Sequence, residues 1–212
     1  MYNFILKLDM TITKLIGNNY VSIFYNYLDK EKVDIFFQNI TKLGEGYFEI
    51  ILILFFIYMI KNTKQKEKYY FFIKGNIYTF LSSGIVVSIL KRIIGRERPY
   101  VSFSPNRFYG LKYLYEHNLL WNSSYHSFPS GHTITIFTTI WFLSFNLKNK
   151  IVKLILFFIG GMVGISRIYL SYHWTSDVLF SIFLSYIIAK IVNQKLSQKK
   201  TFKLFKFLSY KC

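Results

Sequence analysis

Three short polar clusters interrupt an otherwise apolar sequence, and the third contains a pair of residues suited to nucleophilic catalysis. The clusters lie at residues 91–99, 129–132 and 166–177. His173 and Asp177, in the third cluster, are four residues apart and would face the same side of a helix, one turn from each other. A carboxylate bonded to one imidazole nitrogen fixes the tautomer and leaves the other nitrogen free to attack. The pair therefore predicts a histidine nucleophile with an orienting acid.

The other polar residues supply what binding and cleaving a phosphate requires. Fixed positive charge comes from Lys91, Arg98 and Arg167. Arginine in particular suits bidentate contact with phosphate oxygens. Ser130 and the backbone N–H of Gly131 add neutral donors at a predicted helix N-terminus, which is a natural anion site. His132 adds a second imidazole. The combined set predicts phosphoryl transfer through a covalent phosphohistidine.

Each cluster also has a purely structural interpretation. Lysine and arginine at a helix end commonly extend to the membrane interface, and a Pro-Ser-Gly sequence commonly starts a helix. A histidine and an aspartate near a helix start can act as a cap and a dipole partner. Ionisable groups at membrane depth are costly and usually functional, so their occurrence together favours catalysis. Two histidines and one carboxylate could hold a metal, but three nearby cations would repel a divalent ion. The sequence therefore predicts no metal and no cofactor.

Five apolar runs must position these clusters. They are residues 47–60, 69–90, 133–147, 151–172 and 174–192. A bilayer core requires about 20 helical residues, with a range of about 17–25, so the first and third runs need flanking residues to complete a span. Buried helices of a soluble protein are the alternative, but too little polar sequence remains to cover a globule. The sequence therefore predicts an all-α integral membrane bundle of five to six transmembrane helices.

The distribution of charge predicts the orientation of this bundle. The formal net charge is +17, and 22 of the 27 basic residues are lysines. Lysines concentrate in residues 61–68, in residues 148–153 and in the tail after residue 194, which alternate correctly to share one side of the membrane. The positive-inside rule makes that side cytoplasmic and places the three polar clusters on the other side. Nucleic acid is not needed to explain the charge.

Composition divides the chain into three parts. Residues 1–42 are predicted to form an N-terminal amphipathic, interfacial segment or a degenerate first span, since Phe4, Leu8 and Ile12 recur at helical spacing. Residues 43–193 form the transmembrane bundle, and residues 194–212 form a Lys-rich cytoplasmic tail. Cys212 is the only cysteine, which excludes an intramolecular disulfide, and the aromatic content of 21% excludes intrinsic disorder.

The three clusters together resemble the type 2 phosphatidic acid phosphatase family, whose superfamily also contains class A acid phosphatases and vanadium haloperoxidases. The matching pattern is Lys91-x6-Arg98-Pro99, Pro129-Ser130-Gly131-His132 and Ser166-Arg167-x5-His173-x3-Asp177. The resemblance implies an acid phosphatase/vanadium haloperoxidase-like helical core. It implies that His173 attacks phosphorus, that Asp177 orients His173, and that His132 protonates the leaving group. The phosphate-binding set that it implies is Lys91, Arg98, Ser130, Gly131 and Arg167. Three further arginines lie outside the pattern and receive no role from it: Arg92, Arg96 and Arg107.

The function that follows from the resemblance is a metal-independent membrane lipid phosphate phosphatase. Its substrate would be a lipid phosphomonoester or diphosphate of the undecaprenyl diphosphate, phosphatidylglycerol phosphate, phosphatidic acid or lipid A type. Phosphotransfer to another acceptor is the alternative activity, and a non-enzymatic lipid-binding protein or transporter is the alternative class. The expected partners are the substrate and membrane lipids, without nucleic acid or an obligate protein partner. Small size and a single catalytic unit predict a bacterial inner-membrane protein whose site faces the periplasm.

Overall fold

The chain folds into helices joined by short loops. The computed structural model describes residues 2–18 and 29–209, with side chains described as far as residue 198. Within these ranges one isolated β-bridge, between Arg96 and Phe108, is present and no strand forms. A short 3-10 helix, η2, covers Ser123–Tyr125. The α-helices are α1 (Tyr2–Ile16), α2 (Lys30–Lys42), α3 (Gly46–Lys61), α4 (Lys66–Ile94), α5 (Gly110–Glu116), α6 (Gly131–Asn146), α7 (Lys150–Tyr169) and α8 (Thr175–Ser209). The predicted all-α fold is confirmed.

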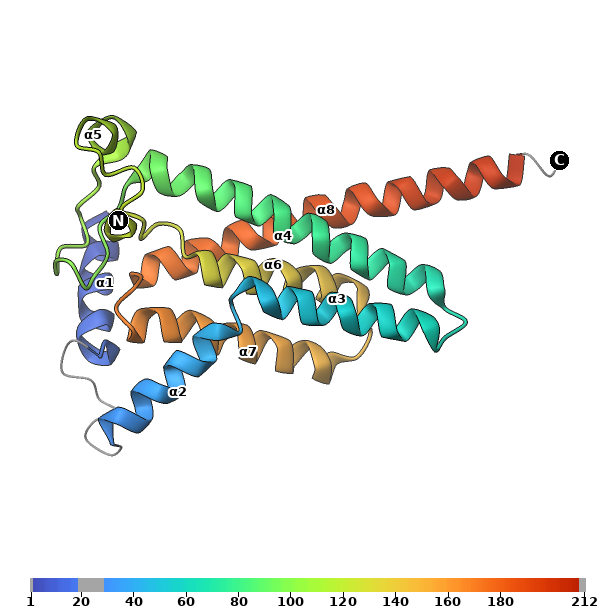
Figure 1. Cartoon of the computed structure of the whole chain (residues 1–212), viewed down its shortest axis with the longest axis horizontal. Coiled ribbons are helices and arrows are strands. Elements are labelled where there is room, and N and C mark those ends of the chain that lie inside the picture. Colours follow the sequence, from blue (N-terminus) through green and yellow to red (C-terminus); the bar gives the residue numbers. More distant parts are fainter. Residues whose placement is uncertain (1, 19–28, 210–212) are drawn as a thin grey trace.

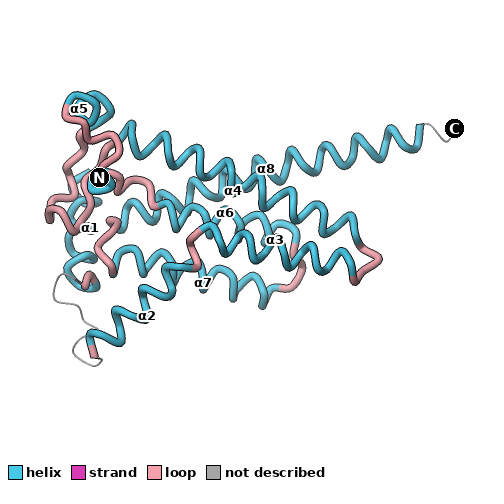
Figure 2. Tube along the Cα trace, viewed as in Figure 1, coloured by secondary structure: helices cyan, strands magenta, loops and turns pink. Residues whose placement is uncertain are grey.

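Five helices, of which α6 is one, form the bundle. Helices α3, α4, α6, α7 and α8 run side by side along the long axis of the molecule, and α1 lies across one end of them (Figure 1). Helix α6 packs against α4, α7 and α8. The longest loop, which includes α5, gathers at the same end as α1 (Figure 2). All three polar clusters of the sequence therefore meet at this end of the bundle.

The core of the bundle is built on α6. Its apolar residues from Ile134 to Leu143 are nearly all buried, and three of its four threonines are buried with them. The hydroxyl of Thr138 donates to the carbonyl of Ile134 at 2.9 Å, and that of Thr139 donates to Glu49 Oε1 at 2.8 Å. A polar side chain can be buried at low cost when its hydrogen bonds are made internally. Helix α6 is thus enclosed by its neighbours on most sides.

Fewer helices have the length of a membrane span than the sequence predicts. Among the described residues, α4, α7 and residues 175–198 of α8 are long and apolar enough to cross a membrane. Helices α2 and α3 would form a fourth span if the pair, bent by 54°, crosses as one unit. Helix α6 has only 16 residues, which at 1.5 Å per residue gives roughly 24 Å. Length and hydropathy thus support three or four spans, against the five to six predicted.

The N-terminal segment contains two helices with different surroundings. Helix α1 is buried through Asp9 and Thr13, while Phe4 and Leu15 are exposed. Helix α2 packs against α7 through a cluster that includes Phe37. Residues that precede the predicted boundary at residue 43 therefore pack against the bundle. Helix α8 continues through the start of the predicted tail, residues 194–212, whose last three residues lie outside the described part of the chain.

Gly75 of α4 lies directly against Phe142 of α6. A β-carbon on Gly75 would lie 1.8 Å from Cζ of Phe142, which is fully buried and packs against Phe71 and Phe72. We therefore expect Gly75→Ala to lower the free energy of unfolding by about 1–3 kcal/mol, measured by thermal unfolding in detergent. Gly84→Ala is the matched control on the same helix, because a β-carbon there meets nothing within 4 Å. Equal stability of the two variants would contradict the close packing.

Candidate active site

His173 and Asp177 are buried side by side where α7 gives way to α8. His173 lies in the turn between the helices and is 1% exposed, and Asp177, in the first turn of α8, is fully buried. His173 Nδ1 lies at 2.5 Å from the carbonyl oxygen of Ser127 and at 3.8 Å from Asp177 Oδ2. A carbonyl oxygen can only accept, so Nδ1 carries the proton and Nε2 keeps its lone pair. The hydrogen-bond partner of the imidazole is therefore a backbone carbonyl, and the Asp177 carboxylate lies beyond hydrogen-bond distance of Nδ1.

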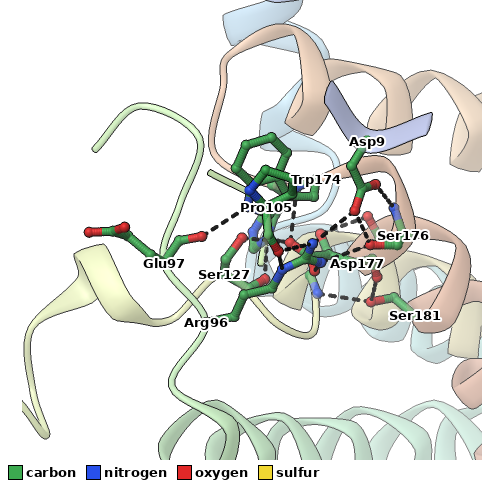
Figure 3. Close-up of polar contacts among 12 residues, drawn as sticks. Asp9, Arg96, Glu97, Pro105, Ser127, Trp174, Ser176, Asp177 and Ser181 are labelled. Carbon is green, nitrogen blue, oxygen red and sulfur yellow. Dashed lines mark hydrogen bonds and ion pairs between the residues drawn. The ribbon is translucent and has the colours of Figure 1, made fainter. Parts of the chain in front are cut away.

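Asp177 is held by donors on both of its oxygens. Oδ2 accepts from the hydroxyl of Ser127 at 2.5 Å and from the backbone N–H of Trp174 at 2.9 Å. Oδ1 forms an ion pair with the buried guanidinium of Arg96 (Figure 3). Because Ser127 donates to Asp177 with its hydroxyl and accepts from His173 with its carbonyl, one residue connects the pair. The hydrogen bonds that link Asp177 to His173 therefore pass through Ser127.

Three cations reach the same region from different elements. Lys91 is in the last turn of α4, and Arg98 follows the helix after Gly95, which adopts a left-handed conformation with φ of 59° that favours glycine. Arg167, in the last turn of α7, donates from Nη1 to the hydroxyl of Thr41 at 2.8 Å. The Nε atoms of Arg98 and Arg167 are buried without a hydrogen-bond partner among the described residues. Buried donors of this kind suit the oxygens of an anion.

The start of α6 completes the arrangement. Ser130 is the N-cap residue, and its backbone N–H donates to the hydroxyl of Ser181 at 2.8 Å. Gly131 brings the first turn of α6 close to Lys91, whose Nζ would lie 3.6 Å from a β-carbon at that position. Nε2 of His132 is 3.7 Å from Oε1 of Glu45, within ion-pair distance. The N-terminus of α6, whose first N–H groups have no partner within the helix, thus lies beside the cationic region.

The electrostatics of this region keep His173 neutral. Burial lowers its pKa well below the usual 6.5, and the positive charges of Arg167, Arg98 and Lys91 lower it further. Since a neutral imidazole is the nucleophilic form, this environment favours attack through Nε2 at neutral pH. The same cations would attract a phosphate group to the ring. The site therefore combines an uncharged imidazole with three nearby cations.

The structure brings together all eight residues that the sequence singles out, at the end of the bundle where α1 and α5 lie. It also places three residues in direct or linked contact with Asp177 that the sequence does not single out: Asp9, Arg96 and Ser127. In the described part of the chain, no group of three or more histidine, cysteine, aspartate or glutamate side chains gathers to hold a metal.

Fold and site together define a helical protein with membrane-spanning lengths of helix and with a buried histidine beside three cations at one end of its bundle. Residues 75–200, which contain all three polar clusters, match the model of the PAP2 superfamily. The match covers more than half of the chain, and the chain belongs to this family. The resemblance noted from the three clusters is confirmed.

Two curated relatives and two solved structures are similar to the chain. Proteins named Lipid A 1-phosphatase from Rhizobium johnstonii and Rhizobium etli are 31% identical over 107 residues and 30% identical over 106 residues. Each alignment covers 48% of this chain, but only 38% and 40% of the relatives, so the chain spans about two-fifths of their length.

LpxE of Aquifex aeolicus has a TM-score of 0.64 and 26% identity over 90% of this chain and 95% of that one. The first transmembrane PAP2 type phosphatidylglycerolphosphate phosphatase from Bacillus subtilis has a TM-score of 0.65 over 93% of this chain and 88% of that one, at 24% identity, and shares the fold. The helices suited to spanning a membrane and these relatives identify the chain as an integral membrane protein.

Proposed function

We propose that this protein hydrolyses a lipid phosphate through a phosphohistidine intermediate. The observation that carries the proposal is the state of His173. Its Nδ1 is bound to the carbonyl of Ser127, its ring is neutral, and three cations are close enough to lower its pKa. An imidazole in this state is prepared to attack an anion that the cations have bound. Membership of the PAP2 superfamily supports the same reaction.

The proposed reaction has two steps. Nε2 of His173 attacks phosphorus, the bond from phosphorus to the lipid oxygen breaks, and His132 gives a proton to that oxygen. Water then attacks the phosphohistidine, the phosphorus–nitrogen bond breaks, and His132 accepts the proton of the water. Lys91, Arg98, Arg167, Ser130 and the N–H of Gly131 would bind the phosphoryl oxygens as charge develops on them. No step requires a metal ion.

The substrate we propose is a lipid phosphomonoester or diphosphate in the outer, periplasmic face of the inner membrane. The curated relatives are named for a lipid phosphate, which supports this class. The site lies at the α1 end of the bundle, and the Lys-rich links between α3 and α4 and between α6 and α7 lie at the other end (Figure 1). The positive-inside rule then supports an inner-membrane protein with its site towards the periplasm.

A panel of purified lipid phosphates assayed in detergent tests the function. We expect phosphate release from at least one of phosphatidic acid, phosphatidylglycerol phosphate, undecaprenyl diphosphate and a lipid A phosphate. We expect that release to continue in EDTA, because the proposed steps use only protein side chains. Loss of activity in EDTA would contradict the metal-free route. Product analysis with an added alcohol or sugar acceptor separates hydrolysis from phosphotransfer, and absence of both reactions with every lipid would contradict the proposal.

A further inference from the structure

Arg96 lies outside the family pattern, yet it is the arginine most completely enclosed at this end of the bundle. The residue is 1% exposed. A guanidinium carries five N–H donors and cannot be buried cheaply unless they are used. Here Nε and Nη2 donate to the carbonyl of Pro105 at 3.2 and 2.8 Å, and Nη1 donates to the hydroxyl of Ser176 at 2.7 Å. The two remaining donors bind the carboxylates of Asp177 and Asp9.

Two short chains of hydrogen bonds connect Arg96 to the ring of His173. In the first, its side chain pairs with Asp177 Oδ1, and Asp177 Oδ2 accepts from the hydroxyl of Ser127. In the second, the backbone carbonyl of Arg96 accepts from the N–H of Ser127 at 2.9 Å. Ser127 is therefore fixed at its N–H and at its hydroxyl, and its carbonyl holds Nδ1 of His173. Figure 3 shows the side chains of Arg96, Ser127 and Asp177 turned towards one another.

The second carboxylate comes from the N-terminal helix. Asp9, in α1, is fully buried and pairs with Nη2 of Arg96 at 2.8 Å. It also accepts from the backbone N–H of Ser176 at 2.7 Å and from the Ser176 hydroxyl at 2.6 Å, so α1 is tied to the first turn of α8 next to Asp177. Loss of Asp9 would leave the ion pair between Arg96 and Asp177 but would remove the acceptor that fixes Nη2 of Arg96 and the acceptor of Ser176. Asp9 thus holds Nη2 of Arg96, while Asp177 holds Nη1.

We propose that Arg96 is a positioning residue for the reaction, and that Asp9 holds it, so that helix α1 is part of the catalytic unit. Arg96 touches neither the substrate nor the reacting atoms. It sets the place of Asp177 and Ser127, and these set the tautomer and direction of the His173 ring. The proposal rests on the phosphohistidine reaction proposed above.

The residue type supports a geometric role. The chain uses 22 lysines and five arginines, so lysine is its usual source of positive charge. A lysine offers one point charge with three donors, whereas the planar guanidinium offers five donors in a fixed fork. The contacts of Arg96 point to Asp177, Ser176, Asp9 and Pro105 in different directions, and one ammonium group cannot meet all of them at once.

The kinetic test compares Arg96→Met, Arg96→Lys and Asp9→Asn with Arg107→Met, which removes a half-exposed arginine that pairs with Glu97. We expect kcat to fall by about 10- to 100-fold in Arg96→Met and about tenfold in Asp9→Asn, with partial recovery in Arg96→Lys. Inhibition by inorganic phosphate and the KM should change less than about threefold, because the cations that bind phosphate are untouched. The double variant of Asp9→Asn and Arg96→Met should be no slower than Arg96→Met alone. Unchanged kcat in the folded Arg96 and Asp9 variants would overturn the proposal.

A second measurement does not depend on activity. Nuclear magnetic resonance of protein with isotope-labelled histidine reports the tautomer of each of the four histidines, and His173→Gln identifies the signal of His173. We expect His173 to carry its proton on Nδ1 in the wild type and to show mixed tautomers in Arg96→Met. If Arg96→Met does not fold, Asp9→Asn and Arg96→Lys provide the comparison. An unchanged single tautomer would overturn the positioning role, whereas a wild type without phosphate release would contradict the proposed reaction alone.

Discussion

His173→Ala should reduce phosphate release by about 10⁴-fold or more while the protein still inserts and binds phosphate. In the proposed mechanism no other group can form the covalent bond to phosphorus. The other imidazole of the site, His132, lies in the first turn of α6 and has Glu45 within ion-pair distance of its Nε2. Removing the ring leaves the cations and the α6 N-terminus in place, so binding should persist when turnover is lost. The measurement is release of inorganic phosphate from the best lipid of the panel in detergent.

The control for this variant is His117→Ala. His117 is exposed, stacks on Tyr113 and bonds the Tyr113 carbonyl with its Nδ1 at 2.9 Å. Its replacement should leave turnover within twofold of the wild type. Denaturing gel analysis after brief reaction with radiolabelled substrate should show a phosphorylated protein in the wild type that is absent in His173→Ala. Turnover near the wild-type rate in a folded His173→Ala protein would contradict a histidine nucleophile.

Much of the fold is predictable because a lipid bilayer restricts which structures can cross it. Apolar runs that include residues 69–90, 151–172 and 174–192 correspond to α4, α7 and α8, since a backbone that crosses a lipid bilayer must satisfy its hydrogen bonds within a helix. The juxtaposition of the three polar clusters is predictable as well, because they fall where the chain emerges on one side. The length of α6 is a poor guide to its position: it has only 16 residues, yet it packs against α4, α7 and α8 inside the bundle.

The contacts that arrange the site are less predictable, because they join distant parts of the chain. Arg96 is 87 residues from Asp9 and 81 from Asp177, and no periodicity connects them. The four-residue spacing of His173 and Asp177 predicts a direct hydrogen bond. In the structure Nδ1 of His173 instead bonds the Ser127 carbonyl at 2.5 Å and lies 3.8 Å from Asp177 Oδ2, and His173 lies in a turn before α8 begins. One signal was available: Arg96 is an arginine in a chain that otherwise prefers lysine.

His132→Ala should produce a loss that depends on the group that leaves. With a lipid phosphomonoester the leaving oxygen is strongly basic and needs a proton, so we expect kcat to fall by about 10³-fold. With p-nitrophenyl phosphate the leaving oxygen is weakly basic, and the first step should be affected much less. Because His132 is also proposed to activate water, the second step should still be slow. The variant should therefore release about one equivalent of nitrophenol per protein in a rapid burst, followed by slow turnover.

The burst distinguishes an acid–base role from a structural role for His132. Its side chain lies at the start of α6, beside Ser130 and Gly131, so its loss could also disturb phosphate binding. In that event both substrates would lose activity to the same extent, no burst would appear, and inhibition by inorganic phosphate would weaken. An equal loss without a burst would contradict proton transfer by His132. A burst with unchanged phosphate inhibition would require separate roles for the two histidines. His173 would attack phosphorus, and His132 would transfer protons to the leaving oxygen and from the entering water. Their positions agree with these roles, because His173 lies in the turn before α8 and His132 lies in the first turn of α6.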